Sequence, residues 1–439
     1  MAWRARHWWG IGVAAAVLAV VVVLALTFSS PPRTTPAATS VSTAPTPAPA
    51  SATRTSSPAT PSRPRGTATS GTTPVPPPPG SATQAPPSNA PTTDLARQKL
   101  AAMTLGQRVG QAFMVSSPVT GADAQSVHVL ADLHVGNVFL KGRSTAGVDA
   151  IAAVVSDAAG HALEDGVRPF VATDQEGGFV QIMRGPGFDT MPQAIEQGQL
   201  APASLQADAK RWGQQLAAAG VNVNLAPVLD TVPGAAFAPR NAPIGAFGRE
   251  YGYTPAAVSS HGLAFARGML AAGVEPAVKH FPGLGRVTGN TDVTAGVTDS
   301  VTVRNDPYVA PFRDAVSAGV PWLMVSNAYY PKIDTQDLGP FSHVIIQGMV
   351  RGDLGFKGII VSDDICDARQ VAAVPAAQRG VDFINAGGTM VLCTNQSVAP
   401  AMYQGMVAAA QGSPAFARRI DAAALLVLEA KAARGLIAG

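Results

Sequence analysis

Eight short, mostly apolar runs divide the chain from Asp94 onward, and this repetition constrains the fold more than any other feature. The runs are Gln111–Val115, Gly136–Leu140, Pro169–Thr173, Val221–Leu225, Glu275–Lys279, Pro321–Val325, Gly358–Ser362 and Thr389–Cys393. Each has the length and apolar character of a buried strand. The segments between them have helical patterns, and strands that alternate with helices pair in parallel. Eight repeats predict closure into an α/β barrel, and an open, doubly wound sheet is the alternative.

Three of the intervening segments have the clearest helical pattern, namely Pro255–Ala272, Ser342–Arg351 and Ala376–Ala386. The first also has a defined start, because Thr254 is a good N-cap residue and Pro255 suits the first helical position.

Charged residues gather where the apolar runs end, which in a parallel barrel is the active-site edge. Lys279 and His280 end the fifth run, and a lysine after an apolar strand must reach water or an anion. A lone histidine there is more often a core residue, but beside Lys279 and before a Pro-Gly turn ligand contact is favoured.

Asp363 ends the seventh run and Asp364 follows it. Two adjacent carboxylates repel unless cations are near, and Lys279, His280 and Arg249 are the candidates; the alternative is that both acids cap the next helix.

Two further acidic segments follow apolar runs. Asp174-Gln175-Glu176-Gly177-Gly178 comes after the third run and predicts a tight turn with exposed carboxylates. Asp230 comes after the fourth run. Each has a structural alternative, a turn with a helix cap for the first and a structural carboxylate for the second.

The N-terminal segment predicts membrane attachment. Arg4, Arg6 and His7 precede nineteen apolar or small residues, Gly10–Phe28, which as a helix would be about 28 Å long. An uncleaved transmembrane anchor at 10–28, after a cytoplasmic region at 1–9, is the favoured interpretation, and a cleaved secretion signal is the alternative. The arginines predict that the N-terminus lies inside the cell and everything downstream outside it, at the cell membrane.

Residues 29–93 are mainly Pro, Thr, Ser and Ala, and they predict a disordered tether to a domain at 94–439. Residues 1–93 contain six of the 31 Lys and Arg residues and no acid, so the domain has 25 cationic and 28 acidic residues and a net charge of −3. Nothing in this distribution predicts a nucleic-acid partner, and the oligomeric state is not predicted.

The chain has two cysteines, Cys366 and Cys393. They lie just after the seventh run and at the end of the eighth, and these runs are neighbours in a barrel. Because an exported domain meets an oxidising environment, we expect a disulfide between them. Two sulfurs without a cluster of histidines make a poor zinc site.

Several motifs together resemble glycoside hydrolase family 3, in particular its single-barrel branch of exo-β-N-acetylglucosaminidases (NagZ-type). They are Met103-Thr104-Leu105, Asp174–Gly178 with Val180-Gln181, Asn224–Asp230, Lys279–Gly285, Leu354–Gly358 and Ser362-Asp363-Asp364. The resemblance extends over residues 98–400 with the motifs in the expected order. It implies a TIM-like (β/α)8 barrel, a retaining mechanism, and neither a metal nor an organic cofactor.

The resemblance also implies roles for individual residues. Asp363 corresponds to the family's catalytic nucleophile. Asp174, Lys279 and His280 correspond to residues that hold the hydroxyl groups of the terminal sugar. Arg249 resembles the family's sugar-binding arginine, although its neighbourhood is altered.

One departure concerns the proton donor. After the Lys-His-Phe-Pro-Gly segment the branch normally has Asp-Ser-His or Asp-Thr-His, and that histidine is the general acid/base. This chain has Asn290-Thr291-Asp292 instead. We therefore expect Asp292, on the Val287–Gly296 loop, to transfer the proton, with Glu176 or Asp299 as alternatives.

The resulting interpretation is a cell-surface enzyme that hydrolyses terminal β-linked N-acetylhexosamine from cell-wall (peptidoglycan-derived) glycans. The same machinery with a different pocket at the sugar 2-position would make a β-glucosidase or a broader β-glycosidase. A non-catalytic wall-glycan-binding protein is the remaining alternative, because the usual histidine is missing.

Overall fold

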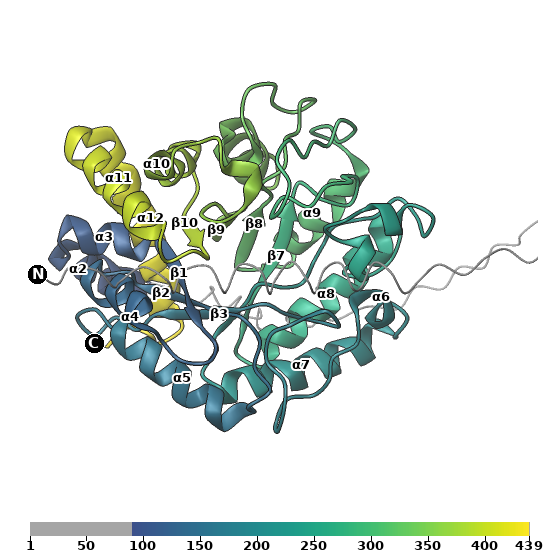
Figure 1. Ribbon diagram of the computed structural model, residues 1–439, viewed down its shortest axis with the longest axis horizontal. Helices are drawn as coiled ribbons and strands as arrows, with labels where there is room; N and C mark the ends of the chain where they lie inside the picture. Colours follow the sequence, from purple (N-terminus) through teal and green to yellow (C-terminus); the bar gives the residue numbers. More distant parts are fainter. Residues whose placement is uncertain (1–89, 439) are drawn as a thin grey trace, which may run out of the picture. The chain divides into compact units, whose positions relative to one another are not determined.

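Eight parallel strands form a closed barrel in the computed structural model, which describes residues 90–438 (Figure 1). Their order around the barrel is β1-β10-β9-β8-β7-β6-β3-β2. The strands are β1 (Phe113–Pro118), β2 (Asn137–Lys141), β3 (Phe170–Thr173), β6 (Val223–Asn224), β7 (Glu275–Phe281), β8 (Trp322–Val325), β9 (Ile359–Asp364) and β10 (Met390–Cys393). Each overlaps one of the eight predicted runs, although β1, β2, β7 and β9 extend beyond theirs. Because β1 pairs with both β2 and β10, the sheet closes and the open-sheet alternative is wrong.

Helices follow the strands and surround the barrel (Figure 1). The α-helices are α2 (Ala90–Ala102), α3 (Leu105–Gln111), α4 (Ala124–Val127), α5 (Val148–His161), α6 (Ala194–Gln197), α7 (Pro202–Ala218), α8 (Pro255–Ala271), α9 (Ala310–Ser317), α10 (Ala376–Ala386), α11 (Ala399–Gly412) and α12 (Pro414–Ala433). The π-helices are η1 (His128–Asp132) and η6 (Val344–Asp353). The 3₁₀-helices are η2 (Ala238–Arg240), η3 (Gly245–Phe247), η4 (Pro307–Val309), η5 (Gly339–Phe341) and η7 (Arg369–Val371). A two-stranded hairpin, β4 (Gln175–Gly177) with β5 (Val180–Gln181), projects after β3.

The three predicted helices are confirmed, with one difference in type. The Thr254 hydroxyl accepts a hydrogen bond from the Ala257 N–H at 3.2 Å, so α8 begins as expected. The segment predicted at Ser342–Arg351 is the π-helix η6, which is wound more widely than an α-helix.

The domain begins slightly earlier than predicted. Helix α2 starts at Ala90, so the expected tether at 29–93 does not extend to residue 93. The proline at its start is tolerated, because the first turn of a helix leaves its N–H groups unpaired anyway. The expected segments at 1–9 and 10–28, and the tether up to residue 89, lie outside the described residues. Between residues 90 and 438, no helix has the length and apolarity needed to cross a bilayer.

The inside of the barrel is apolar and closed at its N-terminal end. Trp322 of β8 and Phe170 of β3 pack with their rings nearly perpendicular and the centroids 5.0 Å apart. Below them Lys431 of α12 is fully buried, and its ammonium donates to Gln111 Oε1 at 2.7 Å and to the Gly136 carbonyl at 3.0 Å. Because side chains fill the interior, we expect a ligand to bind at the carboxyl ends of the strands.

Candidate active site

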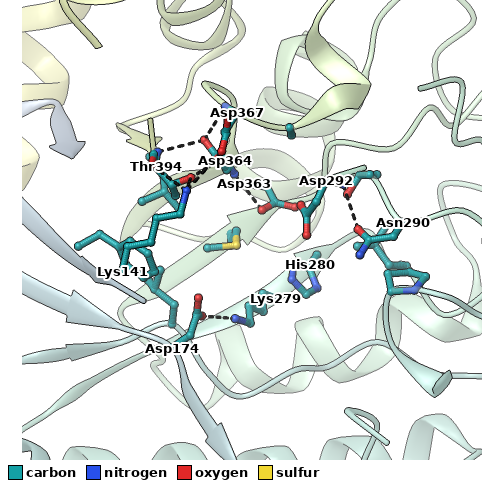
Figure 2. A pocket seen from close by; sticks show the side chains of 18 of the residues that line it. Lys141, Asp174, Lys279, His280, Asn290, Asp292, Asp363, Asp364, Asp367 and Thr394 are labelled. Carbon is teal, nitrogen blue, oxygen red and sulfur yellow. Dashed lines mark hydrogen bonds and ion pairs between the residues drawn. The ribbon is translucent and has the colours of Figure 1, made fainter. Parts of the chain in front are cut away.

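A cavity of about 410 Å³ opens at the carboxyl ends of the strands (Figure 2). All six residues predicted to contact substrate or to react with it line this cavity: Asp174, Arg249, Lys279, His280, Asp292 and Asp363. They come from the ends of β3, β7 and β9 and from two loops, so the barrel gathers residues that are far apart in the sequence.

Two cations and two carboxylates form one side of the cavity. The Lys279 ammonium contacts Asp174 Oδ1 and Glu176 Oε1, each at 2.6 Å. The Arg249 guanidinium donates two hydrogen bonds to the Glu176 carboxylate, at 2.7 and 2.8 Å, and one to the Pro243 carbonyl at 2.7 Å. Such two-pronged pairing fixes both side chains in position.

Glu176 is the hub of this network, and its environment differs from the prediction. Gly177 and Gly178 form the expected turn, with φ values of 110° and 53°, but Glu176 is only 3% exposed. Burial alone would raise the pKa of Glu176, but Arg249 and Lys279 outweigh it and lower this pKa to about 2. Glu176 is thus a permanent anion and a poor proton donor, which argues against it as the general acid. The prediction of exposed carboxylates is wrong for Glu176, because its two cationic partners compensate its burial.

His280 is held by a fully buried carboxylate. Its Nδ1 lies 2.7 Å from Asp230 Oδ2, and its backbone N–H donates to Asp230 Oδ1 at 3.2 Å. The Leu284 N–H donates to the same oxygen at 2.7 Å. Asp230 therefore orients the imidazole toward the cavity, and the structural interpretation of this residue holds.

Asp363 and Asp292 point toward one another in the cavity (Figure 2). The Asp364 N–H donates to Asp363 Oδ1 at 2.8 Å, and Asp363 lines the cavity. Burial raises the pKa of Asp363 to about 6, although the nearby His280 opposes this shift, and the Asp292 carboxylate adds to it. Two facing carboxyl groups on a sugar-sized cavity have the chemistry of a nucleophile and a proton donor.

Asp364 has a different task from its neighbour. Its Oδ1 accepts the N–H groups of Cys366, Asp367 and Thr394, and its Oδ2 accepts the Thr394 hydroxyl. It therefore fixes the loop after β9, but it does not cap the next helix, because the N-cap residue of η7 is Ala368. Of the three expected partners of these carboxylates, His280 acts on Asp363, whereas Lys279 and Arg249 pair with Asp174 and Glu176 instead.

The loop with Asp292 is anchored behind the nucleophile. The Asn290 side-chain oxygen accepts the Asp292 N–H at 3.0 Å. The carbonyls of Thr291 and Asp292 accept the N–H groups of Gln370 and Arg369, at 3.0 and 2.9 Å.

The carboxylate of Asp299, the other alternative proton donor, is already engaged in hydrogen bonds within its own loop. Its carboxylate accepts the N–H groups of Val301 and Thr302 and the Thr302 hydroxyl, at 2.6 to 2.9 Å. It also does not line the cavity. Asp292 is thus the best-placed proton donor among the three candidates.

Cys366 and Cys393 are joined by a disulfide, with their Cα atoms 4.9 Å apart. It ties the loop after β9 to the end of β10, as expected from their neighbouring runs.

Several cavity residues were not predicted from the sequence, and Lys141 is the one with the clearest signal. Lys141 ends β2, and its ammonium donates to the Thr394 carbonyl at 2.9 Å and contacts Asp367 at 3.3 Å. The same signal that marked Lys279, a lysine directly after an apolar run, was present at Gly136–Leu140.

Comparisons with known proteins agree with this geometry. The sequence profile described as "Glycosyl hydrolase family 3 N terminal domain" matches residues 104–430. A protein named beta-hexosaminidase from Stenotrophomonas maltophilia (strain R551-3) is 31% identical over 277 residues, which are 60% of this chain and 76% of that protein.

Solved structures of similar fold include a beta-N-acetylhexosaminidase from Beutenbergia cavernae DSM 12333. It is 50% identical, with a TM-score of 0.74, over 75% of this chain and 99% of that one. A glycoside hydrolase family 3 beta-N-acetylglucosaminidase from Paenibacillus sp. str. FPU-7 is 27% identical, with a TM-score of 0.68, over 77% of this chain and 64% of that one. The chain therefore belongs to the glycosyl hydrolase family 3 N-terminal domain family and is a glycoside hydrolase.

Proposed function

We propose that this glycoside hydrolase is a retaining exo-β-N-acetylhexosaminidase that removes terminal β-linked N-acetylhexosamine. The main support is one geometric observation: Asp363 faces Asp292 above a buried group of charged side chains suited to binding hydroxyl groups. The names of the similar proteins from Stenotrophomonas maltophilia and Beutenbergia cavernae point to the same class of sugar. The closed floor of the barrel suits an enzyme that takes the end of a glycan.

In the proposed mechanism the ionised Asp363 attacks the anomeric carbon and forms a covalent glycosyl-enzyme. Asp292 donates its proton to the leaving oxygen as the glycosidic bond breaks. The Asp292 carboxylate then takes a proton from water, the water oxygen attacks the anomeric carbon, and Asp363 is released. Retaining enzymes of this kind hold the two carboxyl groups about 5–5.5 Å apart in the reacting complex.

Asp174, Lys279, His280 and Arg249 are proposed to hold the terminal sugar. The Lys279 ammonium is a hydrogen-bond donor and the half-buried Asp174 carboxylate is an acceptor. The two groups are 2.6 Å apart, which suits a pair of neighbouring sugar hydroxyl groups. Arg249 lines the cavity, and its hydrogen bonds to Glu176 and to the Pro243 carbonyl use three of its five N–H donors, so two donors remain for the sugar.

We also propose that the enzyme works at the cell surface on cell-wall-derived glycans. The apolar segment at 10–28 and the tether that follows support an anchored or secreted domain. The disulfide supports an oxidising compartment. Fractionation of cells, with protease treatment of intact cells, tests this: a protein found only in the cytosol would contradict it.

The activity is tested by comparing the nitrophenyl β-glycosides of N-acetylglucosamine and glucose as substrates of the full chain. We expect turnover of the first to exceed that of the second, with the β-anomer as the first product. Preference for the glucoside would indicate a β-glucosidase. Binding without turnover would indicate a glycan-binding protein, and formation of sugar 1-phosphate on adding phosphate would indicate phosphorolysis.

The role of Asp292 has a separate test. Asp292→Ala should strongly slow the hydrolysis of unactivated disaccharides, while nitrophenyl substrates lose less because their leaving group needs little protonation. Azide should then restore turnover and give a β-glycosyl azide. If Asp292→Ala leaves the rate on disaccharides within about threefold of wild type, Asp292 is not the acid.

A further inference from the structure

Five consecutive exposed residues, 292–296, include the proposed proton donor, and we call them the Asp292 arch. Asp292 and Val293 line the cavity, and Val293 is 75% exposed. The residues at the two ends of the arch, Thr291 and Val297, are only 2% and 4% exposed. An exposed segment of this kind keeps one conformation only if its ends are fixed, because an unrestrained backbone gains conformational entropy.

One buried residue holds both ends of the arch. Gln370, in η7, is 5% exposed. Its backbone N–H donates to the Thr291 carbonyl at 3.0 Å, just before the arch. Just after the arch, its side-chain oxygen accepts the Val297 N–H at 2.8 Å, and its side-chain nitrogen donates to the Val297 carbonyl at 2.9 Å. Gln370 therefore closes the base of the arch with three hydrogen bonds.

Two backbone hydrogen bonds support the same base. The Arg369 N–H donates to the Asp292 carbonyl at 2.9 Å, and the Tyr329 N–H donates to the Val297 carbonyl at 3.0 Å. Both bonds join main-chain atoms, so they remain possible when the Gln370 side chain is replaced. A variant of Gln370 consequently tests the contribution of its side chain alone.

Gln370 is itself fixed to the strand that bears the nucleophile. It lies seven positions after Asp363, and the disulfide of Cys366 ties the chain between them to the end of β10. The buried Arg379 guanidinium donates to the carbonyls of Ile365 and Cys366, at 3.1 and 2.8 Å. These contacts give the arch a fixed position relative to Asp363.

This position matters because Asp292 and Asp363 have to act on the same glycosidic bond. Their carboxyl groups point toward one another in the cavity (Figure 2). Retaining enzymes need the two groups about 5–5.5 Å apart. Misplacing a catalytic group by about 1 Å can lower the rate about 100-fold.

We propose that Gln370 is a positioning residue for the general acid/base. It holds the Asp292 arch against the segment that follows Asp363, so that Asp292 stays within reach of the leaving oxygen. Gln370 does not line the cavity, so it acts through Asp292 and not on the sugar. This inference deepens the proposed function and rests on it, because Asp292 is the proton donor in that mechanism.

Gln370→Leu tests the proposal in the full chain, because it removes both side-chain hydrogen bonds to Val297 at similar volume. On N,N′-diacetylchitobiose, whose leaving group needs a proton, kcat/KM should fall about 30-fold. On the nitrophenyl β-glycoside of N-acetylglucosamine the loss should be about threefold or less, and azide should speed the turnover and give a β-glycosyl azide.

Gln215→Leu is the matched control. The Gln215 side-chain oxygen also accepts a loop N–H, that of Asp189 at 3.0 Å, but neither residue lines the cavity. This variant should change kcat/KM by less than about twofold on both substrates.

Equal losses on the two substrates would mean that Gln370 supports the fold or the sugar site, and would overturn the proposal. A loss below about twofold on chitobiose would overturn it as well. If Gln370→Leu does not fold, Gln370→Glu replaces it, because the ionised carboxylate keeps the acceptor for the Val297 N–H and loses the donor. The same dependence on the leaving group is expected there, with a loss of about fivefold on chitobiose, and equal losses again overturn the proposal.

Hydrogen exchange measured by mass spectrometry tests the contacts without catalysis. In Gln370→Leu, peptides that cover residues 291–297 should exchange at least about tenfold faster than in the wild type, while peptides from β8 should not change. Unchanged exchange would reject the hold of Gln370 on the arch. Faster exchange together with a wild-type protein that turns over no glycoside would support that hold and reject the proposed function.

Discussion

Lys279 and Lys431 are both buried in the barrel, at opposite ends, and they have opposite electrostatic environments. Lys279, at the carboxyl end of β7, contacts two carboxylates. Lys431, at the closed end, contacts a glutamine side chain and a backbone carbonyl, and neither is charged. Burial would lower the pKa of Lys279, but Asp174 and Glu176 outweigh it and raise this pKa above its ordinary value. Burial lowers the pKa of Lys431 to about 7.

The difference shows what each end of the barrel does. At the active-site end, the charge of Lys279 is compensated by two carboxylates, and its ammonium lines the cavity where a polar ligand can reach it. At the closed end, a lysine satisfies two buried acceptors below the apolar interior, and its charge is a cost that the neutral form avoids.

Asp363→Ala should have the largest effect, and only on activity. Removing the nucleophile is expected to lower turnover by about 10⁴-fold or more. The unfolding midpoint should stay near that of the wild type, because the Asp363 carboxylate is itself disfavoured by burial. Steady-state kinetics and urea unfolding check both statements. Activity within tenfold of wild type would remove Asp363 from the mechanism.

Lys279→Met should damage both stability and activity. It leaves Asp174 without its cation and Glu176 with Arg249 alone, and breaking a buried ion pair costs about 3 kcal/mol. Misplacement of the sugar should also reduce kcat/KM by at least about 100-fold. Urea unfolding and kinetics measure the two effects. A variant as stable and active as the wild type would mean that the Asp174–Lys279–Glu176 contacts are not needed.

Lys431→Met tests the other end through the pH dependence of stability. Between a pKa of about 7 in the folded protein and about 10.4 in the unfolded chain, the unfolded chain binds more protons. The free energy of unfolding should therefore rise with pH in this window, by up to about 1.4 kcal/mol per pH unit. In Lys431→Met the free energy of unfolding should no longer rise with pH in this window, and the catalytic residues are unchanged. Urea unfolding at neutral and mildly alkaline pH checks it; equal slopes in both proteins would show that Lys431 is charged when folded.

Asp292→Asn should shift the pH profile of the nucleophile. Asp363 must be ionised to attack, so kcat/KM of the wild type should fall below about pH 6. Burial is the main cause of this raised pKa, and the negative charge of Asp292 adds to it, so the amide should move the acid limb to lower pH. The profile is measured with a nitrophenyl substrate, which needs little proton donation. Asp367→Asn, on the same cavity, is the control and should leave the limb in place.

Local sequence patterns were enough to predict the strands, because each buried strand is a short apolar run. They also predicted the rim residues, since a charged side chain after such a run has to face the cavity. The partners of those residues were not predictable in the same way: Lys279 and Asp174 are 105 positions apart, and only closure of the barrel brings them together. The exposure of Glu176 was misjudged for the same reason, because its two cations come from distant segments.

The most direct test of the account is to trap the covalent intermediate. The full-length enzyme is treated with a fluorinated N-acetylglucosaminyl fluoride, which forms the glycosyl-enzyme quickly and releases it slowly. Mass spectrometry of the intact protein should show the addition of one sugar, and the peptide that carries it should have the modification on Asp363. A sugar attached to any other residue, or turnover with inversion at the anomeric carbon, would contradict the account.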